Sequence, residues 1–171
     1  MIFPWLRRPE LRVLLVCRAN VCRSPMAEAL LRHHLRTLGA ARRVGVSSAG
    51  TAALAGQRPD PRGVRALKEK GIPPVRHRSR PLRTRDFERH DYILAADREV
   101  LEALRSRVPA GRECTLHLLT HWSGDLHNSD IPDPYYANPA GFERVRDLME
   151  KALSAFVERA LLPALLSGEK P

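Results

Sequence analysis

Short, mostly apolar runs in this chain are separated by longer stretches in which apolar residues recur at helical spacing. The runs cover Leu11–Val16, Val44–Ser48, Tyr92–Ala96 and Cys114–Leu119. Short apolar runs bounded by polar residues are typical of strands that are buried on both faces. We therefore expect four strands at these positions.

Helices are expected between the runs and after the last one. One has Pro25 in its first turn, a second covers Pro61–Lys70 and ends at Gly71, a third covers Thr84–Phe87 with Thr84 as its cap, and a fourth is capped by Asp97. The last expected helix carries one apolar stripe, formed by Phe142, Val145, Leu148, Met149, Ala152 and Phe156.

Strands that alternate with helices predict a parallel sheet with helices on both faces, because a parallel connection has to cross over the sheet. The expected fold class is α/β: a single doubly wound, flavodoxin-like domain with a four-stranded parallel sheet flanked by helices. At 171 residues the chain suits one domain, expected at residues 11–166. Weakly ordered ends are expected at residues 1–10 and 167–171.

The charge of the chain is strongly positive, with 29 Lys and Arg residues against 19 Asp and Glu residues. Such a surface attracts anionic partners such as phosphorylated proteins. We expect no nucleic-acid partner, because the basic residues are dispersed, aromatic residues make up only 5%, and no nucleic-acid-binding motif appears.

Three cysteines without a recognisable signal peptide argue against a disulfide framework and for a reducing compartment, so we expect a cytoplasmic protein. No apolar run approaches the length that a bilayer requires, so no membrane insertion is expected. The seven histidines show no metal-ligand spacing, and neither a metal nor another cofactor is expected. The oligomeric state stays open between a monomer and a weak dimer.

The loop after the first expected strand contains Cys17 and Arg23 and leads into a helix with Pro25 in its first turn. Backbone N–H groups at a helix N-terminus lack intrahelical partners and, with the helix dipole, form a site for a tetrahedral oxyanion. The same field favours a thiolate at Cys17, which predicts a nucleophile. Arg23 offers a planar fork for two phosphate oxygens. In an open α/β sheet, ligands bind beyond the carboxyl ends of the strands, where this loop lies.

Two segments carry a family resemblance. Cys17–Glu28 includes Asn20 and Cys22-Arg23-Ser24-Pro25, and a distant segment reads Asp133-Pro134-Tyr135-Tyr136. They resemble the signature and the general-acid loop of the low-molecular-weight protein tyrosine phosphatases. The resemblance covers roughly residues 11–161. Further matches lie in the middle of the chain, at Ser47–Thr51, Asp60–Arg62, Gly71-Ile72 and Asp91–Leu94.

The resemblance implies a fold of the phosphotyrosine phosphatase I type and hydrolysis of phosphotyrosine in proteins through a phosphocysteine intermediate. Cys17 would be the nucleophile, and Arg23 would hold the phosphate together with the loop amides. Asp133, rather than Asp130, would be the general acid and base, because it precedes Pro-Tyr-Tyr. No cofactor would be needed.

Supporting roles are also implied by the resemblance. Ser24 would help the thiolate to leave, and Asn20 would brace the loop in a left-handed conformation. Ser48 and His77 would join that brace. Cys22 would have a redox role, as the cysteine that traps the oxidised nucleophile in a reversible disulfide.

The substrate cleft departs from the family's pattern. Tyr135 and Tyr136 would form one wall, and Leu54 belongs to the facing wall, where the family often carries an aromatic residue. Arg18 and Ala19 stand where an apolar or small residue followed by glycine is common. Arg18 adds positive charge at the rim, whereas Ala19 fits the loop only with a negative φ.

Val21 resembles the isoleucine of tyrosine-selective members rather than the threonine of relatives that accept phosphoarginine. Two other functions stay open. A thiol-dependent arsenate reductase would need further cysteines, and Cys114 is the one cysteine outside the loop. A non-catalytic phosphate-binding module would be compatible with Arg18, Ala19 and the missing aromatic residue.

Overall fold

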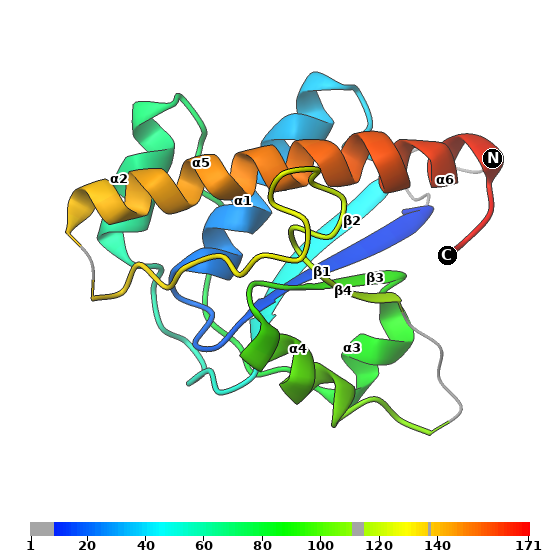
Figure 1. The fold of residues 1–171 in the computed structure, drawn as a ribbon, viewed down its shortest axis with the longest axis horizontal. Coiled ribbons are helices and arrows are strands. Elements are labelled where there is room, and N and C mark those ends of the chain that lie inside the picture. Colours follow the sequence, from blue (N-terminus) through cyan, green and yellow to red (C-terminus); the bar gives the residue numbers. More distant parts are fainter. Residues whose placement is uncertain (1–8, 111–114, 137) are drawn as a thin grey trace, which may run out of the picture.

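The computed structural model describes residues 9–110, 115–136 and 138–171. Its sheet consists of β1 (Leu11–Cys17), β2 (Val44–Gly50), β3 (Tyr92–Ala95) and β4 (Thr115–Leu118). The strand order is β2-β1-β3-β4 and every pairing is parallel (Figure 1). The predicted four-stranded α/β fold is therefore confirmed. Cys114, expected in the last strand, lies outside the described residues.

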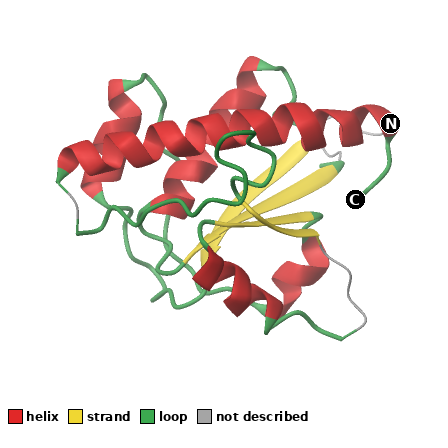
Figure 2. Cartoon of the chain, in the orientation of Figure 1, coloured by secondary structure: helices red, strands yellow, loops and turns green. Residues whose placement is uncertain are grey.

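The helices cover both faces of this sheet (Figure 2). Their bounds are α1 Arg23–Thr37, α2 Pro61–Glu69, α3 Thr84–Arg89, α4 Arg98–Arg105 and α5 Pro139–Phe156. Helices α1, α2 and α5 lie on one face, and α3 and α4 lie on the other (Figure 1). No helix in the three described ranges is long and apolar enough to cross a membrane.

Alternating side chains of β1 supply two hydrophobic cores. Leu11, Val13 and Leu15 belong to the core beneath α1 and α5, whereas Leu14 and Val16 belong to the core beneath α3 and α4. All five side chains are buried. Burial on both faces explains why β1 reads as a continuous apolar run rather than as an alternating pattern.

The C-terminal helix is longer than its apolar stripe predicted. After α5 it continues through the π-helical turn η2 (Val157–Leu161) into α6 (Leu162–Ser167). The wider turn comes just before Pro163, whose ring and missing N–H disturb the bonding of the preceding turn. Leu165 in α6 is buried, and its carbonyl accepts a hydrogen bond from Arg43 Nη2 at 2.8 Å, so this extension closes the core.

Two predicted caps have different outcomes. Asp97 caps α4 as expected, because its Oδ1 accepts the backbone N–H of Val100 at 2.8 Å. The prediction for Thr84 is wrong by one position: Thr84 is already the first residue of α3, and Arg83 precedes the helix. There the backbone N–H of Arg83 donates to Asp86 Oδ2 at 2.8 Å, so the carboxylate three residues later closes the turn.

The topology brings distant segments to one edge of the sheet. The carboxyl ends of β1 and β3 are neighbours, so the loop after Cys17 lies next to the segment that follows Ala95. The long loop after β4 returns across the same edge, where the N–H of Ile131 donates to the carbonyl of Ala96 at 2.8 Å. The predicted nucleophile loop and acid loop therefore meet.

Candidate active site

The nucleophile loop, residues 17–24, joins β1 to α1 and presents a sulfur atom among hydrogen-bond donors. Cys17 Sγ lies 3.0 Å from Ser24 Oγ and accepts the backbone N–H of Asn20 at 3.3 Å. Within the described residues, the other backbone N–H groups from Arg18 to Ser24 donate to no protein acceptor. Such a ring of N–H groups at a helix N-terminus fits a tetrahedral oxyanion.

Asn20 makes hydrogen bonds across the base of this loop. Its φ is 57°, in the left-handed region, and its Nδ2 donates to Ser24 Oγ at 2.8 Å and to Ser48 Oγ at 3.0 Å. Its Oδ1 accepts the N–H of Arg80 at 2.9 Å, and its carbonyl accepts from His77 Nε2 at 2.8 Å. The structure therefore brings Ser48 and His77 to the loop.

The brace reaches one residue that sequence reasoning assigned no role. Ser48 Oγ donates to Glu28 Oε2 at 2.7 Å, and Arg32 Nε donates to Glu28 Oε1 at 3.0 Å. Arg32 also reaches the carbonyl of Val46 on β2. The spacing of Glu28 and Arg32 on one helix face was the available signal.

Two small residues allow the loop to pack against β2. A Cβ atom on Gly50 would lie 2.5 Å from the carbonyl oxygen of Arg18, so only glycine fits there. Among the described non-glycine residues, Asn20 and Asn128 alone have positive φ. Ala19 therefore has the negative φ that the sequence required of it.

Arg23 is held by three groups from other parts of the chain. Its side chain is only 5% exposed, Nη1 donates to Asp97 Oδ2 at 2.5 Å and to the carbonyl of Ile131 at 2.8 Å, and Nη2 lies 3.3 Å from Asp133 Oδ2. Burial by itself would lower the pKa of Arg23, but the hydrogen bond to Asp97 and the charges of Cys17 and Asp133 raise it. The guanidinium stays charged beside the nucleophile.

The position of Asp97 in the site was missed at the sequence level. Sequence reasoning recognised Asp97 only as a helix cap, yet one carboxylate oxygen caps α4 and the other holds Arg23. Its place directly after β3, at the carboxyl edge of the sheet, was the signal for a site residue.

The acid loop brings Asp133, and not Asp130, to Cys17. Asp133 lines the same cavity as Cys17, and its side chain is 49% exposed. Asp130 instead accepts the backbone N–H of Arg98 at 3.0 Å and pairs with its guanidinium at 3.3 Å. Of these two carboxylates, Asp133 lines the cleft and Asp130 does not.

The cleft above the nucleophile loop has a volume of about 660 Å³. Three segments line it: the nucleophile loop, the segment before α2 and the acid loop. The lining residues are Cys17, Arg18, Ala19, Val21, Cys22, Arg23, Gln57, Arg58, Pro59, Asp60, Pro61, Asp133, Tyr135 and Tyr136. The two tyrosine rings meet edge to face, with their centroids 5.0 Å apart.

Leu54 is not among the residues that line this cleft. Its side chain is 71% exposed, and its carbonyl accepts a hydrogen bond from Ser79 Oγ at 2.5 Å. The N–H groups of Gly56 and Gln57 also bond to Ser79, at 2.8 and 2.9 Å. These three bonds fix the loop so that Gln57, rather than Leu54, lines the cleft.

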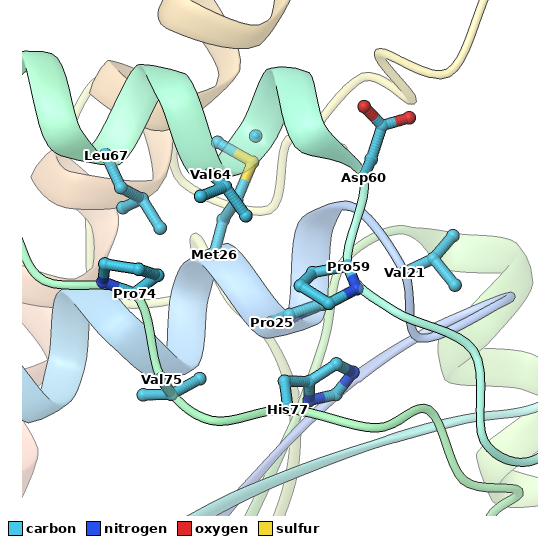
Figure 3. Close-up of a pocket in the computed structure, with 11 residues that line it drawn as sticks. Val21, Pro25, Met26, Pro59, Asp60, Val64, Leu67, Pro74, Val75 and His77 are labelled. Atoms are coloured by element: carbon cyan, nitrogen blue, oxygen red, sulfur yellow. The ribbon is translucent and has the colours of Figure 1, made fainter.

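Beneath the nucleophile loop, a small, mostly apolar pocket separates it from α2 (Figure 3). Val21, Pro25 and Met26 form one side, facing Val64 and Leu67 of α2. Val21, Pro59 and Asp60 line both this pocket and the cleft, so the same packing supports one wall of the cleft.

Cys22 differs chemically from Cys17. It is 5% exposed, and its Sγ lies 3.9 Å from Asp60 Oδ2, within reach of a weak hydrogen bond. Burial, together with the charges of Asp60, Asp133 and Cys17, raises the pKa of Cys22 to about 12. Cys22 is therefore a neutral thiol near pH 7 and a weak nucleophile there.

These residues combine a sulfur nucleophile, unbonded N–H donors, a charged guanidinium and a carboxyl group around one cavity. This set suits displacement at a tetrahedral phosphate. Within the described residues, no group of three or more His, Cys, Asp and Glu side chains is placed to hold a metal ion.

Known proteins give this arrangement a family. Residues 12–163 match the profile of the family described as low molecular weight phosphotyrosine protein phosphatase. The phosphatase of this name from Schizosaccharomyces pombe is 38% identical over 135 residues, which cover 78% of this chain and 86% of the yeast protein.

Solved structures agree. A low molecular weight phosphotyrosine phosphatase from Vibrio cholerae has a TM-score of 0.81 and 34% identity, with 86% of this chain and 95% of that chain covered. The YwlE arginine phosphatase from Geobacillus stearothermophilus has a TM-score of 0.79 and 29% identity, with 91% and 96% covered. The predicted resemblance is confirmed. This chain belongs to the low molecular weight phosphotyrosine protein phosphatases and is a hydrolase.

Proposed function

We propose that this enzyme hydrolyses phosphotyrosine in proteins by two displacements through a phosphocysteine on Cys17. One observation carries the proposal: Cys17, Arg23 and Asp133 border the same cavity, and the loop N–H groups other than that of Asn20 have no protein acceptors within the described residues.

In the first step the Cys17 thiolate attacks phosphorus, and the bond from phosphorus to the phenolic oxygen breaks. Arg23 and the loop N–H groups bind the non-bridging oxygens, whose negative charge they stabilise in the transition state. Asp133 in its protonated form gives its proton to the leaving oxygen. Its 49% exposed side chain is accessible to a substrate in the cleft.

In the second step water attacks the phosphocysteine, and Asp133, now a carboxylate, accepts the proton of that water. The bond between phosphorus and Cys17 Sγ breaks, and the electron pair returns to sulfur. Ser24 Oγ, 3.0 Å from the sulfur, donates a hydrogen bond to the departing thiolate. The enzyme is then ready for another turnover.

The cleft favours phosphotyrosine over phosphoarginine. Tyr135 and Tyr136 form an aromatic wall, and Val21 is an apolar member of the lining. A substrate ring gains apolar and edge-to-face contacts with such a wall, which a flexible guanidino chain does not match. Because one similar structure is of an arginine phosphatase, both substrates belong in the test.

Substrates with acidic residues beside the phosphotyrosine fit the charge of the rim. Arg18 and Arg58 both line the cleft. Asp133 is engaged with Arg23 at 3.3 Å and Asp60 with Arg62 at 2.8 Å, whereas Arg18 pairs with the exposed Glu99 at 3.5 Å in a solvent-screened contact. The rim therefore attracts acidic peptides, chiefly at low salt.

We also propose a cytoplasmic location and a redox role for Cys22. Cys17 and Cys22 are both free thiols, which suits a reducing compartment. When peroxide oxidises Cys17 to a sulfenic acid, Cys22 Sγ attacks that sulfur, an S–S bond forms, the S–O bond breaks, and the oxygen leaves as water with the thiol proton. The raised pKa of Cys22 makes this trap slow at neutral pH.

Phosphate release tests the proposed function. The parent, Cys17→Ser and Asp133→Asn are compared on a phosphotyrosine peptide and a phosphoarginine peptide, with reductant present. We expect turnover of the phosphotyrosine peptide, none by Cys17→Ser, and a loss of about 10²- to 10⁴-fold in Asp133→Asn. Binding of the phosphotyrosine peptide by the parent without release of phosphate would instead indicate a binding module.

A further inference from the structure

Arg62, in the first turn of α2, connects the two loops of the active site although it does not line the cleft. Its Nε and Nη2 hold the carboxylate of Asp60 at 3.1 and 2.8 Å, and Nη2 also donates to the carbonyl of Tyr135 at 2.9 Å. Arg62 therefore contacts both the segment before α2 and the acid loop, and its Nη2 takes part in both contacts.

On the first side, Asp60 is tied to the nucleophile loop. Its backbone N–H donates to the carbonyl of Val21 at 2.8 Å, and its Oδ2 lies 3.9 Å from Cys22 Sγ. Its Oδ1 accepts the N–H of Arg62, which caps α2. Because Asp60 is bonded to the nucleophile loop and also holds Arg62, it fixes the position of Arg62 relative to that loop.

On the second side, Tyr135 is tied to the general acid. The backbone N–H of Tyr135 donates to Asp133 Oδ1 at 3.1 Å, so the position of this peptide decides where the carboxylate points. The guanidinium carbon of Arg62 also lies 5.9 Å from the centre of the Tyr135 ring and 4.5 Å from that of Phe142. These contacts orient the fork of Arg62 in one plane.

Electrostatics agree with a firm link between Asp60 and Arg62. Burial would raise the pKa of Asp60, but the hydrogen bonds from Arg62 lower it below its usual value. The hydrogen bond to Asp60 in turn raises the pKa of Arg62. Both groups keep their charges, so the bidentate geometry persists through the neutral pH range.

We infer that Arg62 is a positioning residue for the transfer of a proton to the leaving group. Arg62 fixes the carbonyl of Tyr135, and the N–H of Tyr135 in turn fixes Asp133 Oδ1. Asp60 links these contacts to the nucleophile loop. The inference rests on the proposed role of Asp133 as the general acid.

The leaving group separates this role from a merely structural one. A phenol of low pKa leaves without a proton, whereas a phenol of high pKa depends on the general acid. If Arg62 only stabilised α2, its removal would affect all substrates alike. If it positions Asp133, its removal affects only the substrates that need the proton.

The experiment measures kcat/KM for a series of aryl phosphates whose phenols span pKa values from about 4 to about 10. The variants are Arg62→Ala and Arg62→Lys, with Arg65→Ala as the matched control. Arg65 lies one turn further along α2, is exposed, and pairs with Glu69 at 2.9 Å. Urea denaturation of each variant checks that the fold is retained.

We expect Arg62→Ala to lose about 10-fold or more on the least acidic phenol and less than about 2-fold on the most acidic one. Arg62→Lys keeps one donor for the Tyr135 carbonyl without the fork, so its loss should be intermediate. Arg65→Ala should match the parent throughout. In an Asp133→Asn background, adding Arg62→Ala should change kcat/KM little, because the two residues act on one step.

An equal loss on every leaving group, or a full additional loss in the Asp133→Asn background, would overturn the inference. If Arg62→Ala fails to fold, Arg62→Lys carries the same test. If Asp133→Asn itself has the same leaving-group dependence as the parent, the assignment of Asp133 fails, and with it both the proposed acid and the role of Arg62. If Asp133→Asn loses most on the least acidic phenols but Arg62→Ala loses equally on all phenols, the proposed role of Arg62 alone is wrong.

Discussion

The nucleophile loop and the acid loop meet at one cleft, but the protein holds them in different ways. Asn20 at the centre of the nucleophile loop is completely buried, and its amide makes three hydrogen bonds. In the acid loop the side chain of Asp133 is 49% exposed and Tyr136 is 96% exposed. A phosphate group has one shape and needs a fixed site, whereas the rest of the substrate varies and must enter and leave.

The two loops should therefore differ in how well they tolerate mutation. A fully bonded buried network loses stability sharply when one member is removed, because the remaining groups stay buried without partners. An exposed side chain leaves few such groups behind. Mutations in the nucleophile loop should therefore affect both stability and turnover, whereas mutations in the acid loop should affect catalysis alone.

The largest effect is expected from Asn20→Ala. The change removes one hydrogen bond each from Ser24 and Ser48 and the side-chain acceptor of the N–H of Arg80, and it places an alanine at a φ of 57°. We expect the free energy of unfolding to fall by about 2–4 kcal/mol. Urea denaturation measures this, and kcat/KM should fall by about 10-fold or more because the sulfur and its donors lose alignment.

Asn128→Ala is the control for that change, because Asn128 is exposed and has a φ of 53°. It shares the left-handed backbone without the buried network. Equal destabilisation by both substitutions would mean that backbone conformation, rather than the hydrogen bonds of Asn20, holds the nucleophile loop.

A smaller loss in the free energy of unfolding is expected when the pH is lowered. It should arise on β4, the strand that leads into the acid loop. His117 on β4 stacks on His121 with ring centroids 4.2 Å apart, and burial lowers the pKa of His117 to about 4. The unfolded chain takes up this proton near pH 6.5, whereas the folded protein resists it until about pH 4. The free energy of unfolding should therefore fall as the pH drops between these values, by up to about 2 kcal/mol, because solvent around the partly exposed ring reduces the roughly 3 kcal/mol that the full pKa difference would give.

His117→Phe keeps a ring for stacking but cannot take up a proton, so it should flatten this part of the pH dependence. Urea denaturation at pH values from about 7 to about 4 measures the effect. His33→Phe, on α1, serves as the matched control. A slope that survives in His117→Phe would assign the acid sensitivity to another group.

The smallest effect is expected from Tyr136→Ala. Because the side chain is almost fully exposed, the free energy of unfolding should change by less than about 0.5 kcal/mol. KM for a phosphotyrosine peptide should rise by about 3-fold, since one edge-to-face contact with the substrate ring is lost. Loss of stability comparable to that of Asn20→Ala would contradict the contrast between the two loops.

Much of the fold followed from local patterns. The apolar run of β1 and the cap at Asp97 depend on residues close in sequence, and the structure contains them. The extension of the last helix did not follow, because it continues through a wide turn before Pro163 that an apolar stripe does not record.

The candidate site was predictable where a compact motif carries it. Cys17, Arg23 and the brace residue Asn20 lie within one loop, and the structure gives them the expected surroundings. Leu54 was expected at the cleft and instead lies outside its lining, because hydrogen bonds to Ser79 decide how that loop turns. Those bonds join residues more than twenty positions apart.

By itself, the sequence determined the strand and helix pattern, the nucleophile loop with its helix N-terminus, and the resemblance that pointed to Asp133. The tertiary structure alone decided that Asp97 holds Arg23, that Glu28 anchors Ser48, and that Arg62 joins the two loops. The physical reason is the separation in sequence of the residues that interact. Helical spacing, caps and turns are set by neighbours in the chain, whereas these contacts exist only after parallel strands bring distant loops to one edge of the sheet.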